Sequence, residues 1–74
     1  MSYTLQDLQT VVGHRLKKIR TDRKESARHV TGQIHMCPKT LRKIENGQSI
    51  WLVETFGRLC EYYKVAPGDL FEGF

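Results

Sequence analysis

The chain of 74 residues has few cysteines, and those it has follow no pattern that would cross-link a small fold. Cys37 and Cys60 form no Cys-x-x-Cys pair. Small secreted domains held together by disulfides carry more cysteines than this, so we expect both thiols to be reduced. Cys37 lies close to His29 and His35 along the chain, but this set lacks the ligand spacing of a zinc finger. We therefore expect no metal and no other cofactor.

The sequence also lacks long hydrophobic runs. No stretch approaches the roughly 20 apolar residues of a membrane-spanning helix, and Met1–Leu8 has neither the basic start nor the apolar centre of a signal peptide. The pairs of carboxylates, nucleophile and base sets, and glycine-rich phosphate loops that indicate an enzyme are missing too. These absences favour a cytoplasmic protein that has no enzymatic activity and does not bind a membrane.

Aromatic residues are scarce, at 9%, whereas hydrophobic residues as a group make up 39% of the chain. So short a chain can bury only a modest core. A core built mainly from leucine, isoleucine and valine is most simply enclosed by helices. We expect an all-α fold and a single domain over residues 1–74.

Acidic residues are outnumbered by basic ones, with 8 Asp and Glu against 12 Lys and Arg, which gives a net charge of +4. Clustered cations release counterions from a nucleic acid when they bind it. The charge balance therefore indicates a polyanionic partner, with nucleic acid as the first candidate.

Apolar residues recur at spacings of three and four along most of the chain, as is typical of amphipathic helices. Thr4 and Ser26 are favourable N-cap residues at the start of two such segments. Gly13 interrupts the first segment, where it either bends the helix or permits the close approach of another backbone. The predicted helices cover Leu5–Arg23, Ala27–Ile34, Pro38–Asn46 and residues 53–63, and a last turn starts at Pro67.

The stretch from Pro38 to Gly47 has both ends of a short helix marked. Proline in the first turn loses no hydrogen bond, and glycine accepts the left-handed geometry that ends a helix. Leu41 and Ile44 lie on one face, and three cations project from the other side: Lys39, Arg42 and Lys43. Together with the preceding short helix and its connection, this stretch predicts a helix-turn-helix.

A series of residues along the chain carries a family resemblance. Arg15–Arg20 reads Arg-Leu-Lys-Lys-Ile-Arg, and Thr40–Gly47 reads Thr-Leu-Arg-Lys-Ile-Glu-Asn-Gly, followed by Glu54-Thr-Phe and Val65. This series resembles the Cro/cI-type helix-turn-helix domains of phage repressors and xenobiotic-response-element regulators. The resemblance implies a compact five-helix, lambda repressor-like domain whose helix 38–46 enters the DNA major groove, usually as a homodimer on a near-palindromic operator.

The resemblance also implies roles for single residues. Lys39, Arg42 and Lys43 match positions that face base edges. We expect Lys39 and Arg42 to read bases, because early exposed positions of such a helix come nearest to them, whereas Lys43 reaches a base or only a phosphate. Alternatively, all three cations merely neutralise phosphates. Contacts to the DNA backbone are expected from Ser26, Arg28, Cys37, Thr40 and Asn46.

Two further positions are expected to be structural. Arg20 and Glu45 match the internal ion pair of the family, which ties the first helix to the recognition helix. Cys37 stands at the N-cap position of that helix, and a helix N-terminus lowers the pKa of a thiol. We expect the Cys37 thiol to cap the helix in place of a serine.

Several positions depart from the family pattern. Ala27 stands where a glutamine usually anchors a phosphate, and Thr31 replaces a small alanine between the two helices. His35 replaces a glycine in the left-handed turn, so we expect a wider turn. Lys24 and Glu25 replace a glycine and an apolar residue, so we expect the segment before the second helix to be less buried.

These observations predict a sequence-specific regulator that binds double-stranded DNA, acts as a repressor in the nucleoid and takes no small-molecule ligand. A homodimer is expected because one short helix reads only a few base pairs. Leu70 and Phe71 are candidate contacts unless they close the core instead; the other candidates are Trp51 and Phe74. The alternative function is a protein-interaction module of the same fold, such as an antitoxin that binds a toxin.

Overall fold

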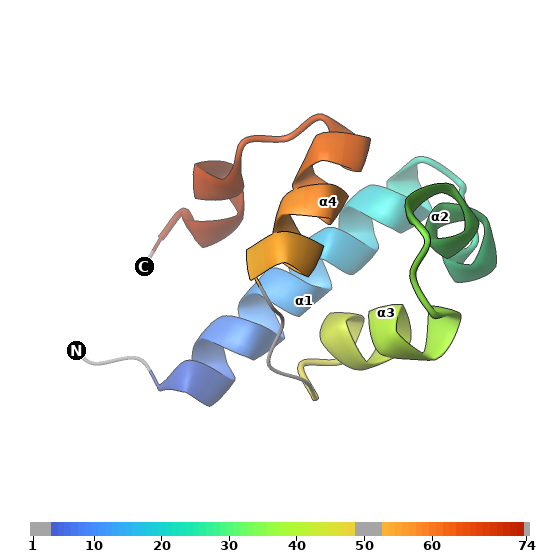
Figure 1. Ribbon diagram of the computed structural model, residues 1–74. Coiled ribbons are helices and arrows are strands. Elements are labelled where there is room, and N and C mark those ends of the chain that lie inside the picture. The colour runs from blue at the N-terminus through green and yellow to red at the C-terminus, as the bar shows by residue number, and fades with distance from the viewer. Residues whose placement is uncertain (1–3, 49–52, 74) are drawn as a thin grey trace.

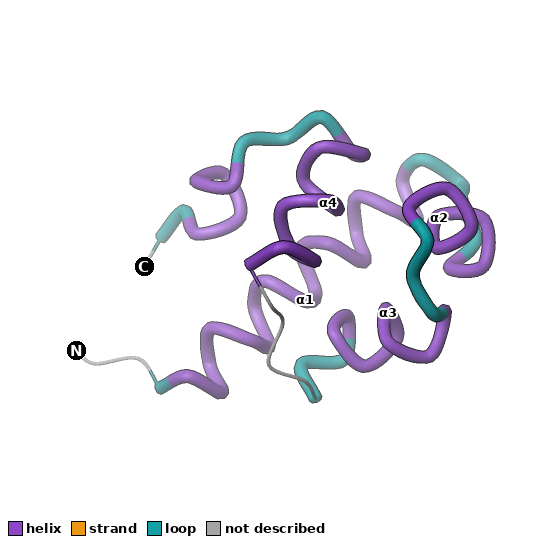
Figure 2. Tube along the Cα trace, viewed as in Figure 1, coloured by secondary structure: helices purple, strands orange, loops and turns teal. Residues whose placement is uncertain are grey.

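The computed structural model describes residues 4–48 and 53–73, and it is helical throughout those ranges except for the connections (Figures 1 and 2). The elements are α1 (Leu5–Asp22), α2 (Ala27–Ile34), α3 (Pro38–Glu45), α4 (Val53–Tyr63) and a short 3₁₀ helix, η1 (Pro67–Phe71). In Figure 1, α1 runs diagonally through the molecule, and α2 and α3 lie on the side away from the two chain ends.

The prediction of a fifth α-helix was wrong for the described residues. The segment that starts at Pro67 is a 3₁₀ helix of five residues, and it is followed by extended backbone at Glu72. Only Leu70 of this segment is buried. A segment with a single core residue has little tertiary packing to hold an α-helix, and 3₁₀ helices occur mainly as short segments such as this one.

Helix α1 begins at Leu5, as the predicted N-cap at Thr4 indicated. The Thr4 hydroxyl accepts a hydrogen bond from the Asp7 N–H at 3.1 Å, and the Asp7 carboxylate accepts one from the Thr4 N–H at 3.0 Å. This reciprocal pair satisfies two N–H groups that a helix start would otherwise leave unpaired. The helix ends at Asp22, with Arg23 as its C-cap, one residue earlier than predicted.

The core is formed by one face of each helix. Val30 of α2 and Leu59 of α4 are fully buried between the other helices, and the remaining core positions with 2% exposure or less are Val12, Leu16, Leu41, Ile44 and Leu70. Thr31 is also buried, and its hydroxyl donates to the Ala27 carbonyl at 2.8 Å. This bond satisfies the hydroxyl within its own helix, which explains how a threonine occupies a position where a small alanine was expected.

Gly13 brings the backbones of α1 and α3 into direct contact. A Cβ atom at this position would lie 2.2 Å from the Ile44 carbonyl oxygen. Helix α1 is continuous from Leu5 to Asp22. Of the two roles that the sequence left open for Gly13, close approach of another backbone is therefore the one that the structure assigns.

Replacing Gly13 by alanine should destabilise the fold. Alanine is favoured over glycine in a helix by about 0.5–1 kcal/mol, but the added methyl group must push α3 away, and overpacking of this kind costs about 1–3 kcal/mol. Gly57 of α4 is the matched control, because a Cβ there would meet nothing within 4 Å. Urea denaturation should show Gly13→Ala to be less stable and Gly57→Ala to be more stable than the parent. A Gly13→Ala protein as stable as Gly57→Ala would refute the close contact.

Candidate nucleic-acid interface

Helices α2 and α3 are joined by a three-residue connection, His35 to Cys37. His35 has φ 56° and ψ 49°, which is the left-handed geometry expected of a glycine. The N–H groups of both His35 and Met36 donate to the Thr31 carbonyl, the latter at 2.9 Å. These bonds close the C-terminus of α2 as a glycine cap would, so the turn is not widened by the histidine.

In the segment before α2, Lys24 and Ser26 are exposed, and Glu25 is half-buried. Glu25 has a side-chain exposure of 15%, and its carboxylate accepts a hydrogen bond from the Tyr62 hydroxyl and forms an ion pair with Arg23. The Tyr62 and Arg23 contacts lower the pKa of Glu25. Glu25 thus joins the corner between α1 and α2 to α4. No local sequence signal connects Glu25 to Tyr62, because the two are 37 positions apart.

Helix α3 presents a basic face to solvent. Leu41, Ile44 and Glu45 are 0–2% exposed, whereas Lys39, Thr40, Arg42 and Lys43 are all exposed. Successive residues of an α-helix are rotated by about 100°. The direction opposite the three buried side chains therefore lies between Lys39 and Lys43, which are one turn apart.

Arg42 lies to one side of this outward direction. It is about 60° from Glu45 around the helix, and Glu45 faces α1. Arg42 is therefore on the flank of α3 next to α1, and Thr40 is on the opposite flank. Of the three predicted base-reading residues, Lys39 and Lys43 occupy the centre of the exposed face.

A bidentate ion pair fixes α3 against α1. The Arg20 Nε and Nη2 atoms donate to the two Glu45 carboxylate oxygens at 2.7 and 3.0 Å. The side chains are 13% and 3% exposed. Arg20 also donates from Nη1 to the Glu25 carbonyl at 2.9 Å. The hydrogen bonds to Glu45 raise the pKa of Arg20 against the opposing effect of burial.

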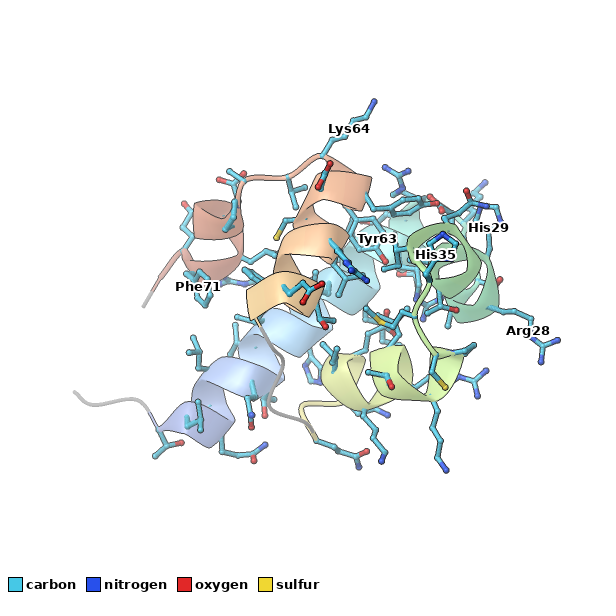
Figure 3. All side chains as sticks on the ribbon, viewed as in Figure 1. Arg28, His29, His35, Tyr63, Lys64 and Phe71 are labelled. Atoms are coloured by element: carbon cyan, nitrogen blue, oxygen red, sulfur yellow. The ribbon has the colours of Figure 1, made fainter. Side chains whose placement is uncertain are left out.

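The residues expected to contact the DNA backbone gather at two helix N-termini. Ser26 is the N-cap of α2, where its hydroxyl accepts from the His29 N–H at 3.0 Å. Arg28 extends outward from α2 (Figure 3). Cys37 and Thr40 are exposed in the first turn of α3. Helix N-termini attract phosphate through their unpaired N–H groups. Asn46 lies apart from these residues, as the exposed C-cap of α3.

Cys37 is the N-cap residue of α3, but its side chain makes no capping hydrogen bond. The backbone N–H groups of Lys39 and Thr40 nevertheless lower the pKa of the Cys37 thiol. Sulfur is a weak hydrogen-bond acceptor. Cys37 therefore occupies the predicted N-cap position, but its thiol does not cap the helix with a hydrogen bond as we expected.

The predicted dimer contacts that the structure describes differ in how exposed they are. Leu70 is 2% exposed and packs in the core, which leaves almost no surface for a second chain. Phe71 is half-buried, and its ring centroid lies 5.5 Å from that of Phe56. Trp51 and Phe74 lie outside the described residues. Sequence reasoning overlooked Leu5, a large hydrophobic residue that is 58% exposed in the first turn of α1.

In the part of the chain that the structure describes, no three His, Cys, Asp or Glu side chains come together as a metal site. Across the same ranges, none of the helices combines the length and the apolar character needed to cross a membrane.

Comparison with known proteins gives a likeness at the level of the fold. The sequence matches no protein-family model and no curated protein. Among solved structures, the crystal structure of the clp gene regulator ClgR from C. glutamicum superimposes with a TM-score of 0.79 at 21% sequence identity. The match covers 85% of this chain and 81% of that chain. The all-helical fold described above is thus also the fold of a gene regulator.

Replacing Glu45 should make the protein less stable, because the largely buried Arg20 guanidinium would lose its carboxylate partner. We expect Glu45→Ala to cost about 3 kcal/mol, as is typical when one partner of a buried pair is lost. The control is Glu54→Ala, which breaks a pair with Arg58 whose side chains are 73% and 51% exposed; it should cost about 0.5 kcal/mol or less. Equal losses in the two variants, measured by thermal and urea denaturation, would contradict the structural role of Glu45.

Replacing Cys37 by serine should stabilise α3. A hydroxyl accepts a hydrogen bond from the first-turn N–H groups better than a thiol does, and a serine N-cap contributes about 0.5–1 kcal/mol. Cys37→Ala is the control, because it removes the sulfur without adding an acceptor. If both variants have the same thermal midpoint, the first-turn N–H groups of α3 gain nothing from a side-chain acceptor at this position.

Proposed function

We propose that this protein is a sequence-specific transcriptional regulator that binds double-stranded DNA, acts as a repressor and has no enzymatic activity. The observation that supports this best is the exposed basic face of α3, which is fixed by a buried ion pair at the end of a helix-turn-helix. Its likeness to the fold of the regulator ClgR adds support at the level of the fold. We further propose that it works in the cytoplasm, on the nucleoid.

In the proposed complex, α3 lies in the major groove with its N-terminal half nearest the bases. Lys39 and Lys43 face the groove floor, where long cations suit the O6 and N7 acceptors of guanine. Arg42, on the flank next to α1, reaches a base edge or the adjacent phosphate. The first turns of α2 and α3 approach the backbone, through Ser26, Arg28, Cys37 and Thr40, and Asn46 contacts a phosphate at the other end of α3.

We also propose that the protein binds as a homodimer. A helix of eight residues spans about 12 Å, so one copy reads only a few base pairs. Two copies on half-sites about one helical turn apart multiply the discrimination. Among the described residues, we propose the exposed side chain of Leu5 as one such contact, together with the predicted contact at Phe71.

Selection from a random duplex pool at a fixed salt concentration tests the proposal directly. We expect enrichment of a near-palindromic sequence, and an affinity that falls steeply as salt is raised because phosphate contacts release counterions. Recovery of no preferred sequence would refute sequence-specific binding. Salt-insensitive association with a protein and not with DNA would favour the antitoxin-like alternative.

Alanine variants on α3 separate base reading from charge neutralisation. If Lys39, Arg42 or Lys43 reads a guanine, its alanine variant should lose about 1–3 kcal/mol on the selected operator and relax the preference at one base pair. A residue that contacts only phosphate should weaken binding to every duplex and reduce the salt slope by about one.

Lys18→Ala is the control, because Lys18 is an exposed cation of α1 that pairs with Asp22. Binding is measured on operator and scrambled duplexes at two salt concentrations. Equal losses on the two duplexes for all three α3 variants would exclude base readout by these residues.

A further inference from the structure

A groove of about 720 Å³ opens to solvent where three helices end. The residue at each of those ends lines it: Arg23 after α1, His35 after α2 and Lys64 after α4. Figure 3 shows His35 at the end of α2 and Lys64 at the end of α4. None of the lining residues belongs to α3 or to the first turn of α2. The groove is therefore distinct from the proposed DNA-binding face.

Two of these residues keep a side chain at a conformational cost. His35 has φ 56° and Lys64 has φ 59°, in the left-handed region where glycine is favoured at a helix end. Backbone strain that persists at particular positions is often linked to function. Both residues line the same groove, and glycine at either position would relieve the backbone but remove the side chain.

The walls of the groove combine apolar and basic groups. Ile34 and the Tyr62 ring are half-buried, whereas the permanently charged lining residues are three cations, Arg23, Arg58 and Lys64, and one carboxylate, Glu61. Arg23 forms an ion pair with Glu25. Arg58 pairs with Glu54, but that pair is exposed and therefore weak. Lys64 has no ion pair among the described residues. The lining thus suits an occupant that carries both an apolar and an acidic group.

Part of the groove is already rigid. The Tyr62 hydroxyl donates to the Glu25 carboxylate, which also holds Arg23, and the Arg23 guanidinium lies 5.4 Å from the centre of the Tyr62 ring. Side chains that are fixed before binding lose less conformational entropy when a ligand arrives. The apolar wall is therefore in place without an occupant.

We propose that this groove binds a peptide segment of a protein partner in which an acidic side chain neighbours an apolar one. Sites for small molecules enclose most of the ligand surface, whereas this groove is open to solvent and would cover only one face of an extended segment. Because the groove shares no lining residue with α3, a partner can occupy it while α3 contacts DNA.

The test uses the full chain and a fluorescein-labelled probe peptide, Glu-Leu-Gly-Glu-Leu-Gly, blocked at both ends. We expect saturable binding by fluorescence polarisation, with amide shift changes at Ile34, His35 and Tyr62. Lys64→Gly should bind the probe about threefold more weakly, the effect of losing one exposed charge contact. His35→Gly should also bind it more weakly, because the variant loses the imidazole N–H as a hydrogen-bond donor. Both variants should also melt at a higher temperature than the parent, so weaker binding cannot be attributed to unfolding.

Lys24→Gly is the matched control. Lys24 is the third non-glycine residue with a left-handed backbone, at φ 57°, and it does not line the groove. Its glycine variant should melt higher with unchanged probe affinity. The proposal is overturned if the three glycine variants bind alike, if a probe with lysine in place of glutamate binds as tightly, or if the shift changes fall on Lys39 and Lys43. The measurement contains no DNA, so its failure leaves the proposed DNA binding untouched.

Discussion

The orientation of α3 depends on the ion pair between Arg20 and Glu45. A buried pair adds little net stability, because the loss of hydration offsets most of the attraction. Its two parallel hydrogen bonds instead define a geometry, since a guanidinium and a carboxylate meet well only in one plane. Glu45 is the last residue of α3, so a fixed Glu45 carboxylate fixes the rotation of the whole helix about its axis. That rotation decides which cations point outward.

Arg20 has a second function at the corner between α1 and α2. Its remaining donor binds the Glu25 carbonyl, while the Glu25 carboxylate binds Arg23 and Tyr62. Through Arg20 and Glu25, α3 is therefore connected to the end of α4 and to the groove beside it. Both the proposed DNA face and the proposed peptide groove are built on this small polar network, which lies at the edge of the apolar core.

Local features of the sequence predicted most of the helical boundaries. The Thr4 and Ser26 caps, and the proline and glycine around α3, place the ends of these helices within a residue of those observed. Features that depend on distant residues were not accessible in this way. The Arg20 and Glu45 pair was expected only from a family resemblance, and the contact between Glu25 and Tyr62 has no local signature. The fifth helix was expected only from the family resemblance, because the segment from Pro67 has a single core residue, Leu70, and no helical period of its own.

The position of Lys43 shows why a surface is harder to predict than a helix. With Leu41 and Ile44 taken as the buried stripe, Arg42 and Lys43 are about equally outward. The burial of Glu45, which a charged residue does not suggest, shifts the outward direction toward Lys43 and moves Arg42 to the flank. A single ion pair thus changes the expected order of contacts across the exposed face.

The contact at Gly13 has a consequence for how binding preference can change. Most helix pairs are separated by side chains that can switch rotamer or size, so their distance and angle drift as the sequence varies. At Gly13 no side chain intervenes, and the spacing of α1 and α3 is set by the radii of backbone atoms, which are the same in every sequence. Substitutions on the outside of α3 therefore alter the chemical groups presented to a ligand while the helix stays where it is. The side chains that recognise a ligand can therefore change in this fold while the position of α3 stays the same.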